Sequence, residues 1–415
     1  MQDTYNAQRR PILSIFSNAS YRWLFISGVM VNVGVWAWLL SSNYLVYEIT
    51  RSPFLVQLNG VAFTVPNLLI GILSGVLADS LNRRRLLQVS YLLNAVVALL
   101  FAWLVLKFHV GAWQVMGATL IIGSVNTLDW AARWTLASNV VERRVLPHTM
   151  ALESASLTGG QFAGPWLAGV LVSIAPLGQV GVTVPLAVIG SLYVAGAVLM
   201  LRVTPLVPQE VIPFEIGAAW ARTTEGIRVI AGNRVVVGTL GVAFLVNVFF
   251  YSYAPLVPVF AKDVLNVGPA QMGLLGGAQG MGCLIGSAYL AMRSDIHRKS
   301  TYFVVGSLIT LAGILFFATS RSYPLSVGSL VFGGVGQGGF SSMLTTLTLI
   351  SVDDVMRGRA SGMVNLAIGG WPLGLLLVGA LAELNGPSFA LICSSTTGLA
   401  LTALWSYRCK EMRKV

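Results

Sequence analysis

The segment FLVQLNGVAFTVPNLLIGILSGVLA, residues 54–78, contains no charged residue and runs directly into the basic turn DSLNRRR, residues 79–85. A helix of about 20 apolar residues is long enough to cross the hydrocarbon core of a bilayer. Lys and Arg concentrate in short loops on the cytoplasmic side of membranes. This stretch therefore predicts a membrane-spanning helix that ends at a cytoplasmic turn.

The same pattern recurs along the whole chain. Of its 415 residues, 55% are hydrophobic and only 10% are charged. A soluble protein carries about 25% charged residues, so this composition suits a surface that faces lipid. The sequence therefore predicts twelve spans, near residues 23–47, 54–78, 86–106, 112–134, 148–173, 182–201, 235–260, 270–292, 301–318, 324–349, 360–382 and 388–407.

The loops between the twelve predicted spans alternate between many and few basic residues, as membrane-spanning helices require. With the N-terminus inside, the inner segments contain 21 of the 26 Lys and Arg residues, including Arg83–Arg85 and the turn from Arg357 to Arg359. This pattern predicts a multi-pass protein of the plasma (inner) membrane with both termini cytoplasmic. The net charge of +11 then reflects loops beside acidic headgroups, and we expect the lipid bilayer, not nucleic acid, as the partner.

Four glycines of the first half recur 210 residues later at the same spacing. They are Gly159, Gly160, Gly164 and Gly169, then Gly369, Gly370, Gly374 and Gly379. Close helix packing explains glycine at each place but not the shared register. We therefore predict an all-α polytopic membrane protein whose twelve transmembrane helices form two pseudo-symmetric six-helix bundles, residues 1–201 and 235–415, the second ending in a short cytoplasmic tail. Residues 202–234 are expected to be a cytoplasmic linker, either plain or with a weak amphipathic helix around residues 214–221.

The turn after residue 78 resembles the signature loop of the major facilitator superfamily, Gly-x-Leu-Ala-Asp-Arg-x-Gly-Arg-Arg. Gly75, Asp79, Arg83 and Arg84 match it, whereas Asn82 stands at the second glycine, where it can take the same left-handed backbone. The resemblance implies a conformational latch, in which Asp79 accepts hydrogen bonds from a neighbouring helix N-terminus or pairs with Arg83. A basic loop that only sets topology is the alternative.

Residues 160–169, GQFAGPWLAG, resemble the motif of exporters and proton antiporters in this superfamily, Gly-x-x-x-Gly-Pro-x-x-Gly-Gly. Gly160, Gly164, Pro165 and Gly169 match the motif. Pro165 removes a helix hydrogen bond and permits a bend, and the glycines let the helix pack closely. The resemblance implies proton-coupled export, with packing alone as the other interpretation.

Shorter stretches resemble the branch of the superfamily that includes macrolide-efflux proteins and the enterobactin exporter. They are Asn32–Gly34, Tyr47–Thr50 and parts of the segment from Ala132 to Leu152. Many members of that branch carry an acid just after the glycine of the first span, but this chain has Val35 there. A proton-carrying role is therefore not expected at that position.

Ionisable side chains within spans are candidates for coupling, because they are costly in lipid. Asp129 and Arg133 lie four residues apart, so they are expected to share a helix face and are able to pair. Glu153 lies on the fifth span, in register with Gly160 and Gly164. Asp129 or Glu153 is the candidate proton carrier, and a purely structural salt bridge is the alternative.

In this superfamily the first, fourth, seventh and tenth spans line a central cavity. Polar and aromatic residues on those spans are therefore candidates for contact with substrate, with simple packing as the competing explanation. They are Asn32, Trp36, Asn43, Asn126, Asn247, Tyr251 and Gln337.

Together these features predict a secondary active transporter, a monomer that exports a small amphipathic compound, such as a drug-like molecule or siderophore, in exchange for protons. An importer or lipid translocator on the same scaffold, or a non-transporting receptor, remains an alternative. No enzymatic activity, cofactor or metal is expected. The sequence shows no metal-ligand cluster, phosphate loop or nucleophile–base set.

Overall fold

The computed structural model describes residues 15–174, 179–206, 233–293, 298–352, 363–364, 367–409 and 411–412, with residues 72–79, 143 and 349 described by their backbone alone. In this part of the chain the regular secondary structure is entirely helical. The first half contains α3 (Ala19–Thr50), α4 (Pro53–Ser80), α5 (Arg83–Lys107), α6 (Ala112–Val140), η1 (Arg143–Val145), α7 (Leu146–Ser173), η2 (Gln179–Val182) and α8 (Thr183–Met200). The second half contains α10 (Arg234–Phe249), η3 (Tyr251–Leu256), α11 (Val257–Val259), η4 (Phe260–Val264), α12 (Pro269–Ala291), α13 (Lys299–Thr319), α14 (Tyr323–Ile350), α16 (Trp371–Asn385) and α17 (Pro387–Arg408).

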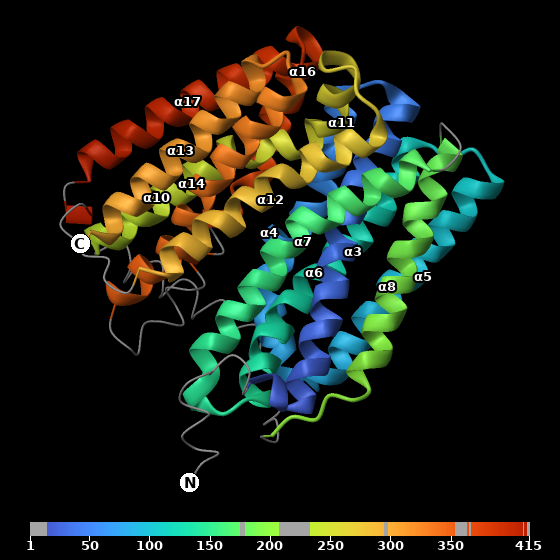
Figure 1. Ribbon diagram of the computed structural model, residues 1–415, viewed down its shortest axis with the longest axis vertical. Helices are drawn as coiled ribbons and strands as arrows, with labels where there is room; N and C mark the ends of the chain where they lie inside the picture. Colours follow the sequence, from blue (N-terminus) through green and yellow to red (C-terminus); the bar gives the residue numbers. More distant parts are fainter. Residues whose placement is uncertain are drawn as a thin grey trace.

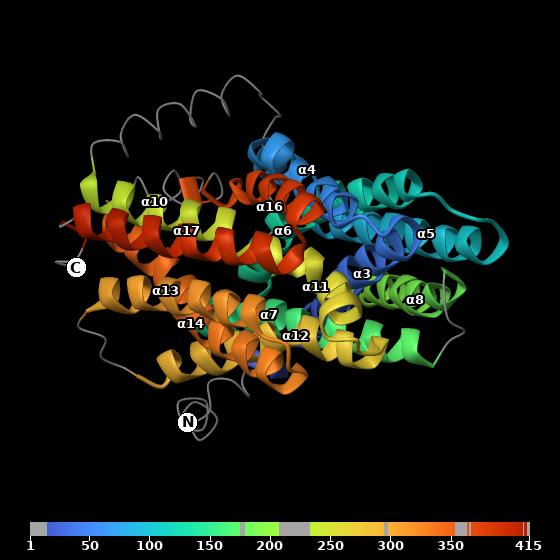
Figure 2. The same ribbon diagram turned by 90° about the horizontal axis from the view of Figure 1, so that it is seen from above.

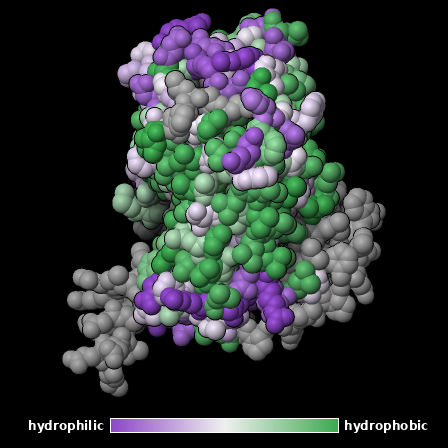
Figure 3. All heavy atoms as spheres, turned by 90° about the vertical axis from the view of Figure 1, so that its right-hand side faces the viewer, coloured by the Kyte–Doolittle hydropathy of each residue, from purple (hydrophilic) through white to green (hydrophobic). Residues whose placement is uncertain are grey.

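These helices coincide with the predicted spans. Eight segments of the described chain are long and apolar enough to cross a membrane, and α16 is a shorter apolar helix. The long helices α6, α7 and α14 complete the set. Figure 3 shows a hydrophobic band between two hydrophilic ends on the face that it presents. The predicted fold class is confirmed, and the chain is a multi-pass membrane protein.

The helices form two groups, α3 to α8 and α10 to α17 (Figure 1). Seen from above, α4 lies beside α16 and α7 lies beside α12 (Figure 2), and both pairs are in contact. In Figure 1 the groups converge near α11 and α16 and diverge toward the two chain termini. We call the converging end, which contains residues 47–54, 257–269 and 382–387, the remote end, and the opposite end the terminal end.

The shared glycine register has a structural counterpart. Gly160 and Gly164 lie against α3 of their own bundle, whereas Gly169 lies against α12 of the other bundle. The matching glycines 210 residues later lie against α10, the counterpart of α3, and against α4 of the opposite bundle. Each half therefore uses two glycines to pack its own bundle and a third to contact its partner bundle.

The α7 and α12 backbones approach closely because glycines line both helices. A Cβ added at Gly273 would lie 2.6 Å from the carbonyl oxygen of Pro165, and one at Gly280 would lie 2.6 Å from the amide nitrogen of Phe162. In lipid no hydrophobic effect drives helices together, so close van der Waals packing supplies much of their attraction. The α7–α12 contact is therefore one seam between the bundles, and the α4–α16 contact is the other.

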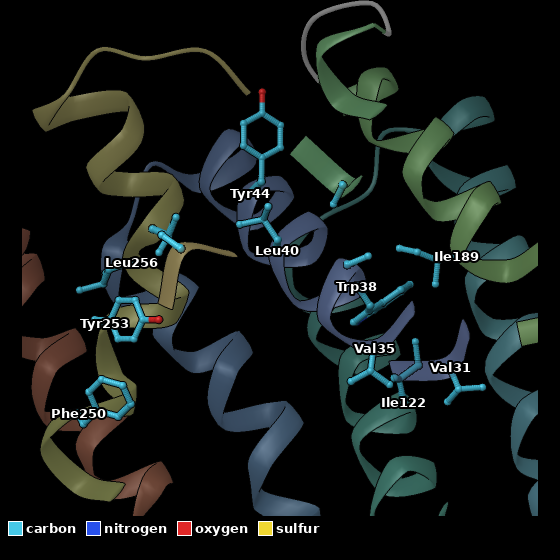
Figure 4. Packing of buried hydrophobic residues seen from close by; sticks show 14 of the residues in the cluster. Val31, Val35, Trp38, Leu40, Tyr44, Ile122, Ile189, Phe250, Tyr253 and Leu256 are labelled. Atoms are coloured by element: carbon cyan, nitrogen blue, oxygen red, sulfur yellow. The ribbon is translucent and has the colours of Figure 1, made fainter. Parts of the chain in front are cut away.

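Opposite faces of α3 serve different purposes. Trp38 points from α3 into the first bundle, toward Ile122 and Ile189 (Figure 4). Its indole nitrogen donates to Oγ1 of Thr119 at 3.2 Å. Trp36, two residues earlier, projects toward the interface between the bundles, because neighbouring residues of a helix point in different directions.

The seventh span, predicted as one helix over 235–260, is interrupted. After α10 it continues as the 3₁₀ turn η3, the short α11 and the π turn η4. Pro255 and Pro258 lie in this stretch and have no backbone N–H. The carbonyl of Ser252, which cannot bond to Pro255, accepts a hydrogen bond of 2.6 Å from Nε2 of Gln57 in α4. Such irregular backbone is tolerated at membrane depth where protein covers it or where it lines a cavity.

The segment expected to join the bundles lies mainly outside the described residues, which omit 207–232. The amphipathic helix expected around residues 214–221 falls there and stays a prediction. The boundaries of the linker at residues 202 and 234 likewise stay a prediction.

The glycine packing predicts opposite outcomes for two neighbouring alanine substitutions. In Gly164→Ala the new Cβ would lie 2.7 Å from the Val33 carbonyl oxygen, so overpacking should cost about 1–3 kcal/mol. At Gly159 nothing lies within 4 Å of the added atom, so Gly159→Ala should leave stability unchanged or raise it by up to about 1 kcal/mol. Thermal unfolding of the two purified variants tests this, and equal melting temperatures would contradict it.

Candidate transport site

A pocket lies between the two bundles. It is lined by α3, α4 and α7 of the first bundle and by η3, α11, α12 and α16 of the second. Its polar and aromatic lining includes Trp36, Asn43, Phe63, Gln161, Tyr251, Tyr253, Gln279 and Trp371. None of the described lining residues is acidic or basic. Aromatic walls with a few amides suit an apolar or amphipathic ligand.

A chain of neutral hydrogen bonds runs along the second-bundle side of this pocket. The Tyr253 hydroxyl donates to Oε1 of Gln279, and Nε2 of Gln279 donates to Oε1 of Gln337. Nε2 of Gln337 then donates to the Tyr251 hydroxyl oxygen at 2.8 Å. Because each glutamine accepts through Oε1 and donates through Nε2, the chain runs in one direction and ends at Tyr251.

The structure separates the seven residues that the sequence suggested for the cavity. Trp36, Asn43 and Tyr251 line the pocket, and Gln337 lies directly behind Tyr251. The other three, Asn32, Asn126 and Asn247, are not among the lining residues of this pocket. Asn32 donates to Oγ of Ser156 on α7 at 3.0 Å, and Asn247 donates to the Ala243 carbonyl of its own helix at 2.8 Å.

Polar contacts join the bundles at the remote end. Nζ of Lys262 donates to Oε1 of Glu48 at 2.6 Å, and the Tyr47 hydroxyl donates to the Asp263 carboxylate. Arg51 adds a second cation 3.6 Å from Glu48. The Lys262 side chain is 37% exposed, so solvent screens the pair and limits it to about 1 kcal/mol.

Glu383 makes a different contact across the seam between α4 and α16. It lies near the C-terminal end of α16, and its Oε2 accepts hydrogen bonds from Oγ of Ser52 at 2.8 Å and from the backbone nitrogen of Phe54 at 3.1 Å. Ser52 immediately precedes α4, so a carboxylate of one bundle caps a helix N-terminus of the other. The positive end of a helix dipole favours this placement.

The embedded charges form a cluster inside the first bundle, away from the pocket. Arg133, 6% exposed, donates from Nε to Oε2 of Glu153 at 2.9 Å. Its two terminal nitrogens donate to the Tyr91 hydroxyl at 3.2 Å and to the Leu24 carbonyl at 3.1 Å. Thus the salt-bridge partner of Arg133 is Glu153 on α7, and not Asp129, which the spacing had suggested. Buried charges require such dense pairing.

Asp129 occupies the remaining acidic position of this cluster. It is 6% exposed and lies within electrostatic range of Arg133, Tyr91 and Glu153. Its Oδ1 has no hydrogen-bond partner among the described residues. The cluster therefore holds one arginine and two carboxyl groups, and one oxygen of each carboxyl, Oδ1 of Asp129 and Oε1 of Glu153, has no hydrogen-bond partner among the described residues.

Gly28 provides the space for the arginine. A Cβ at this position of α3 would overlap the Arg133 guanidinium. No local sequence pattern connects a glycine of the first span with an arginine of the fourth. Only the packing of α3 against α6 brings them together.

The basic turn after α4 is partly structural. Asn82, expected in a left-handed conformation, is extended at φ −64° and ψ 107°, and its side chain caps α5 by accepting from the Arg85 backbone nitrogen. Arg84 donates to the carbonyls of Met200 and Leu201 at the end of α8, where a cation is favoured. The side chain of Asp79 and the surroundings of Gly75 lie outside the described part of the structure, so the proposed latch stays a prediction.

Several functional candidates were not predicted from the sequence. Gln279 had a usable signal, because it is an isolated amide in a glycine-rich span, as is Gln337. Trp371 had a weaker one, directly after the repeated Gly369–Gly370 pair. The Glu48–Lys262 pair had none, because its partners are 214 residues apart in the sequence.

Two bundles of membrane-spanning helices around a shared pocket define a transporter of the major facilitator type. A family model described as transmembrane secretion effector matches residues 11–414, and the chain belongs to that family. The multidrug efflux pump Tap of Mycolicibacterium fortuitum is 25% identical over 422 residues, which cover 98% of each chain.

Solved transporter structures share the fold. A bacterial homologue of the human lysosomal transporter Spinster, in an inward-facing and unoccupied conformation, matches with a TM-score of 0.76 at 11% identity, over 95% of this chain and 97% of the other. A POT family transporter in complex with 5-aminolevulinic acid matches with a TM-score of 0.70 at 12% identity, over 94% and 97%. These likenesses establish the architecture alone.

The buried charge cluster generates a stability prediction. Arg133→Met leaves Glu153 without its partner, which should cost about 3–5 kcal/mol. The double variant Arg133→Met, Glu153→Met should recover much of that loss, because apolar residues often replace a buried pair at little cost. Thermal unfolding measures both, with the exposed Arg85→Met as control. A double variant no more stable than the single one would contradict the pairing.

Proposed function

We propose that this transporter is a proton-coupled exporter of small amphipathic compounds that works by alternating access. The observation that carries the proposal is a pocket lined by both bundles, together with polar contacts that join the bundles at the remote end. Residues 1–201 and 235–415 would rock about this pocket, tethered by residues 202–234 in a monomer. The likeness to a multidrug efflux pump supports export.

The distribution of basic residues supports an orientation for this movement. If the termini are cytoplasmic, the remote end is the outer face, and the structure corresponds to a state closed toward the outside. The pocket would then load from the cytoplasm or the inner leaflet. Breaking the remote-end contacts and closing the terminal end would expose the same pocket to the outside.

Acidic caps at both ends of the bundles would balance the two states. Glu383 caps the start of α4 at the remote end. Asp79 lies near the opposite, terminal end of α4, where it would cap a helix N-terminus of the second bundle. Each such contact contributes about 0.3–2 kcal/mol, so exchanging one for the other leaves two states of similar free energy.

Loss of the remote-end cap should open the outer side more often. Glu383→Ala removes the acceptor for Phe54, which should raise the outward-open population about two- to fivefold. The measurement is the rate at which an impermeant maleimide added outside labels Leu39→Cys, a pocket residue, in a variant without the native cysteines. Glu142→Gln, at the exposed terminal end, is the control. An unchanged labelling rate would contradict the latch.

The charge count of the buried cluster supports proton coupling. One arginine with two ionised carboxylates would leave a net negative charge in a low-dielectric interior, which is costly. Binding one proton makes the cluster neutral. We assign that proton to Asp129, because Glu153 is paired with Arg133 at 2.9 Å whereas Asp129 forms no salt bridge among the described residues.

Whole-cell efflux tests the function and the coupling together. Cells that produce the protein should accumulate less of a lipophilic dye than cells without it, and an uncoupler should abolish the difference. Asp129→Asn mimics the protonated group permanently, so it should abolish uphill efflux while retaining downhill movement of dye. Uphill efflux that survives the uncoupler or this variant would remove the coupling. Dye uptake, or flipping of a lipid analogue in vesicles without dye efflux, would favour an importer or a lipid translocator instead.

A further inference from the structure

Two side chains that line the pocket between the bundles, Tyr251 and Trp371, have donor groups without a described acceptor. The hydroxyl oxygen of Tyr251 accepts from Gln337, which leaves its own proton without a described acceptor. Nε1 of Trp371 is buried and likewise lacks an acceptor among the described residues. Their rings lie side by side, with centroids 4.8 Å apart and planes tilted by 39°. A buried donor left unpaired costs about 1–3 kcal/mol, so both groups favour a ligand that accepts from them.

The hydrogen-bond chain strengthens the Tyr251 donor. Each donor in the hydrogen-bond chain, from the Tyr253 hydroxyl through the amides of Gln279 and Gln337, polarises the next group. Such chains are cooperative. The proton at the end of the chain is therefore a better donor than that of an isolated tyrosine. The chain also holds the Tyr251 oxygen in place, so the donor is positioned before a ligand arrives.

The same pocket disfavours charged ligands. No described lining residue is acidic or basic, and two embedded or interfacial acids are engaged elsewhere: Glu48 is paired with Lys262, and Glu153 with Arg133. A cation or an anion would lose its hydration without meeting an opposite charge. The tyrosine and tryptophan faces attract a cation by about 2 kcal/mol for a desolvated contact, which is less than the cost of stripping water from the ion without an opposite charge nearby.

We propose that the pocket selects neutral aromatic compounds that carry a hydrogen-bond acceptor, such as an aryl carbonyl, and that Tyr251 and Trp371 donate to that acceptor. The ring of the ligand would lie against the aromatic walls formed by Trp36, Phe63 and Trp371. Gln161, on the opposite side in α7, has an amide with no described partner and supplies a second polar contact. This proposal deepens the proposed function by naming the substrate class, and it rests on that function only in taking this pocket as the substrate site.

Four probes that share one ring system test the selectivity. They are 2-acetylnaphthalene, its isostere 2-isopropenylnaphthalene without the acceptor, the anion 2-naphthoate, and the cation trimethyl(2-naphthylmethyl)ammonium. Binding is measured by equilibrium dialysis against the full-length protein in lipid nanodiscs, with empty nanodiscs subtracted. The ketone should bind about fivefold more tightly than the alkene, which is the effect of one net hydrogen bond of about 1 kcal/mol. Both ions should bind more than about tenfold more weakly than the ketone.

Variants assign the effect to the two donors. Tyr251→Phe and Trp371→Phe keep an aromatic ring but remove the donor, so each should lower ketone affinity toward that of the alkene and leave alkene binding unchanged. Tyr323→Phe removes a hydroxyl at the remote end, outside the pocket, and is the control. Melting temperatures identify any variant that fails to fold.

Three results would overturn the proposal. They are an ion that binds as tightly as the ketone, donor variants that weaken all four probes equally, and an absence of binding by the ketone. Transport is measured separately with the same probes in proteoliposomes. Selective binding without movement would contradict the proposed function and leave the ligand class intact. Efflux of the cation in preference to the ketone would contradict the ligand class and leave the transport function intact.

Discussion

The backbones of α7 and α12 meet at Gly169 and Gly273, a contact that no larger residue permits without displacement. Lipid tails are as apolar as the helix surfaces, so hydrophobic burial does not hold these helices together, and close packing must. This seam brings Gln161 of one bundle and Gln279 of the other to the same pocket. The pocket therefore exists because small residues let two bundles touch along part of their length.

Charges are kept out of the pocket and used elsewhere for two different purposes. Inside the first bundle, Arg133 and Glu153 form a nearly inaccessible pair whose disruption is costly in any conformation. At the remote end, pairs such as Glu48–Lys262 are partly exposed and individually weak. The strong ion pair thus lies within a bundle and the weak one between bundles, which is the arrangement that the proposed rocking of the bundles requires.

The helices could be predicted from the sequence because their cause is local. An apolar run of sufficient length has no alternative to a spanning helix, since every backbone group must be satisfied internally in lipid. The interrupted seventh span was less predictable: Pro255 was visible, but its effect depends on Gln57 of another helix, which takes over the Ser252 carbonyl. Asn82 shows the same limit, since its role as a cap depends on where α5 begins.

The sequence by itself determined the number and order of the helices, the duplicated halves and the location of charges in short loops, because length, periodicity and composition act over neighbouring residues. Tertiary structure alone decided which distant residues meet. It paired Arg133 with Glu153 rather than with Asp129, placed Asn247 outside the pocket, and joined Gln279 to Gln337. Helical spacing gives the direction of a side chain relative to its own axis, but the rotation and neighbours of each helix are fixed only by packing against the others.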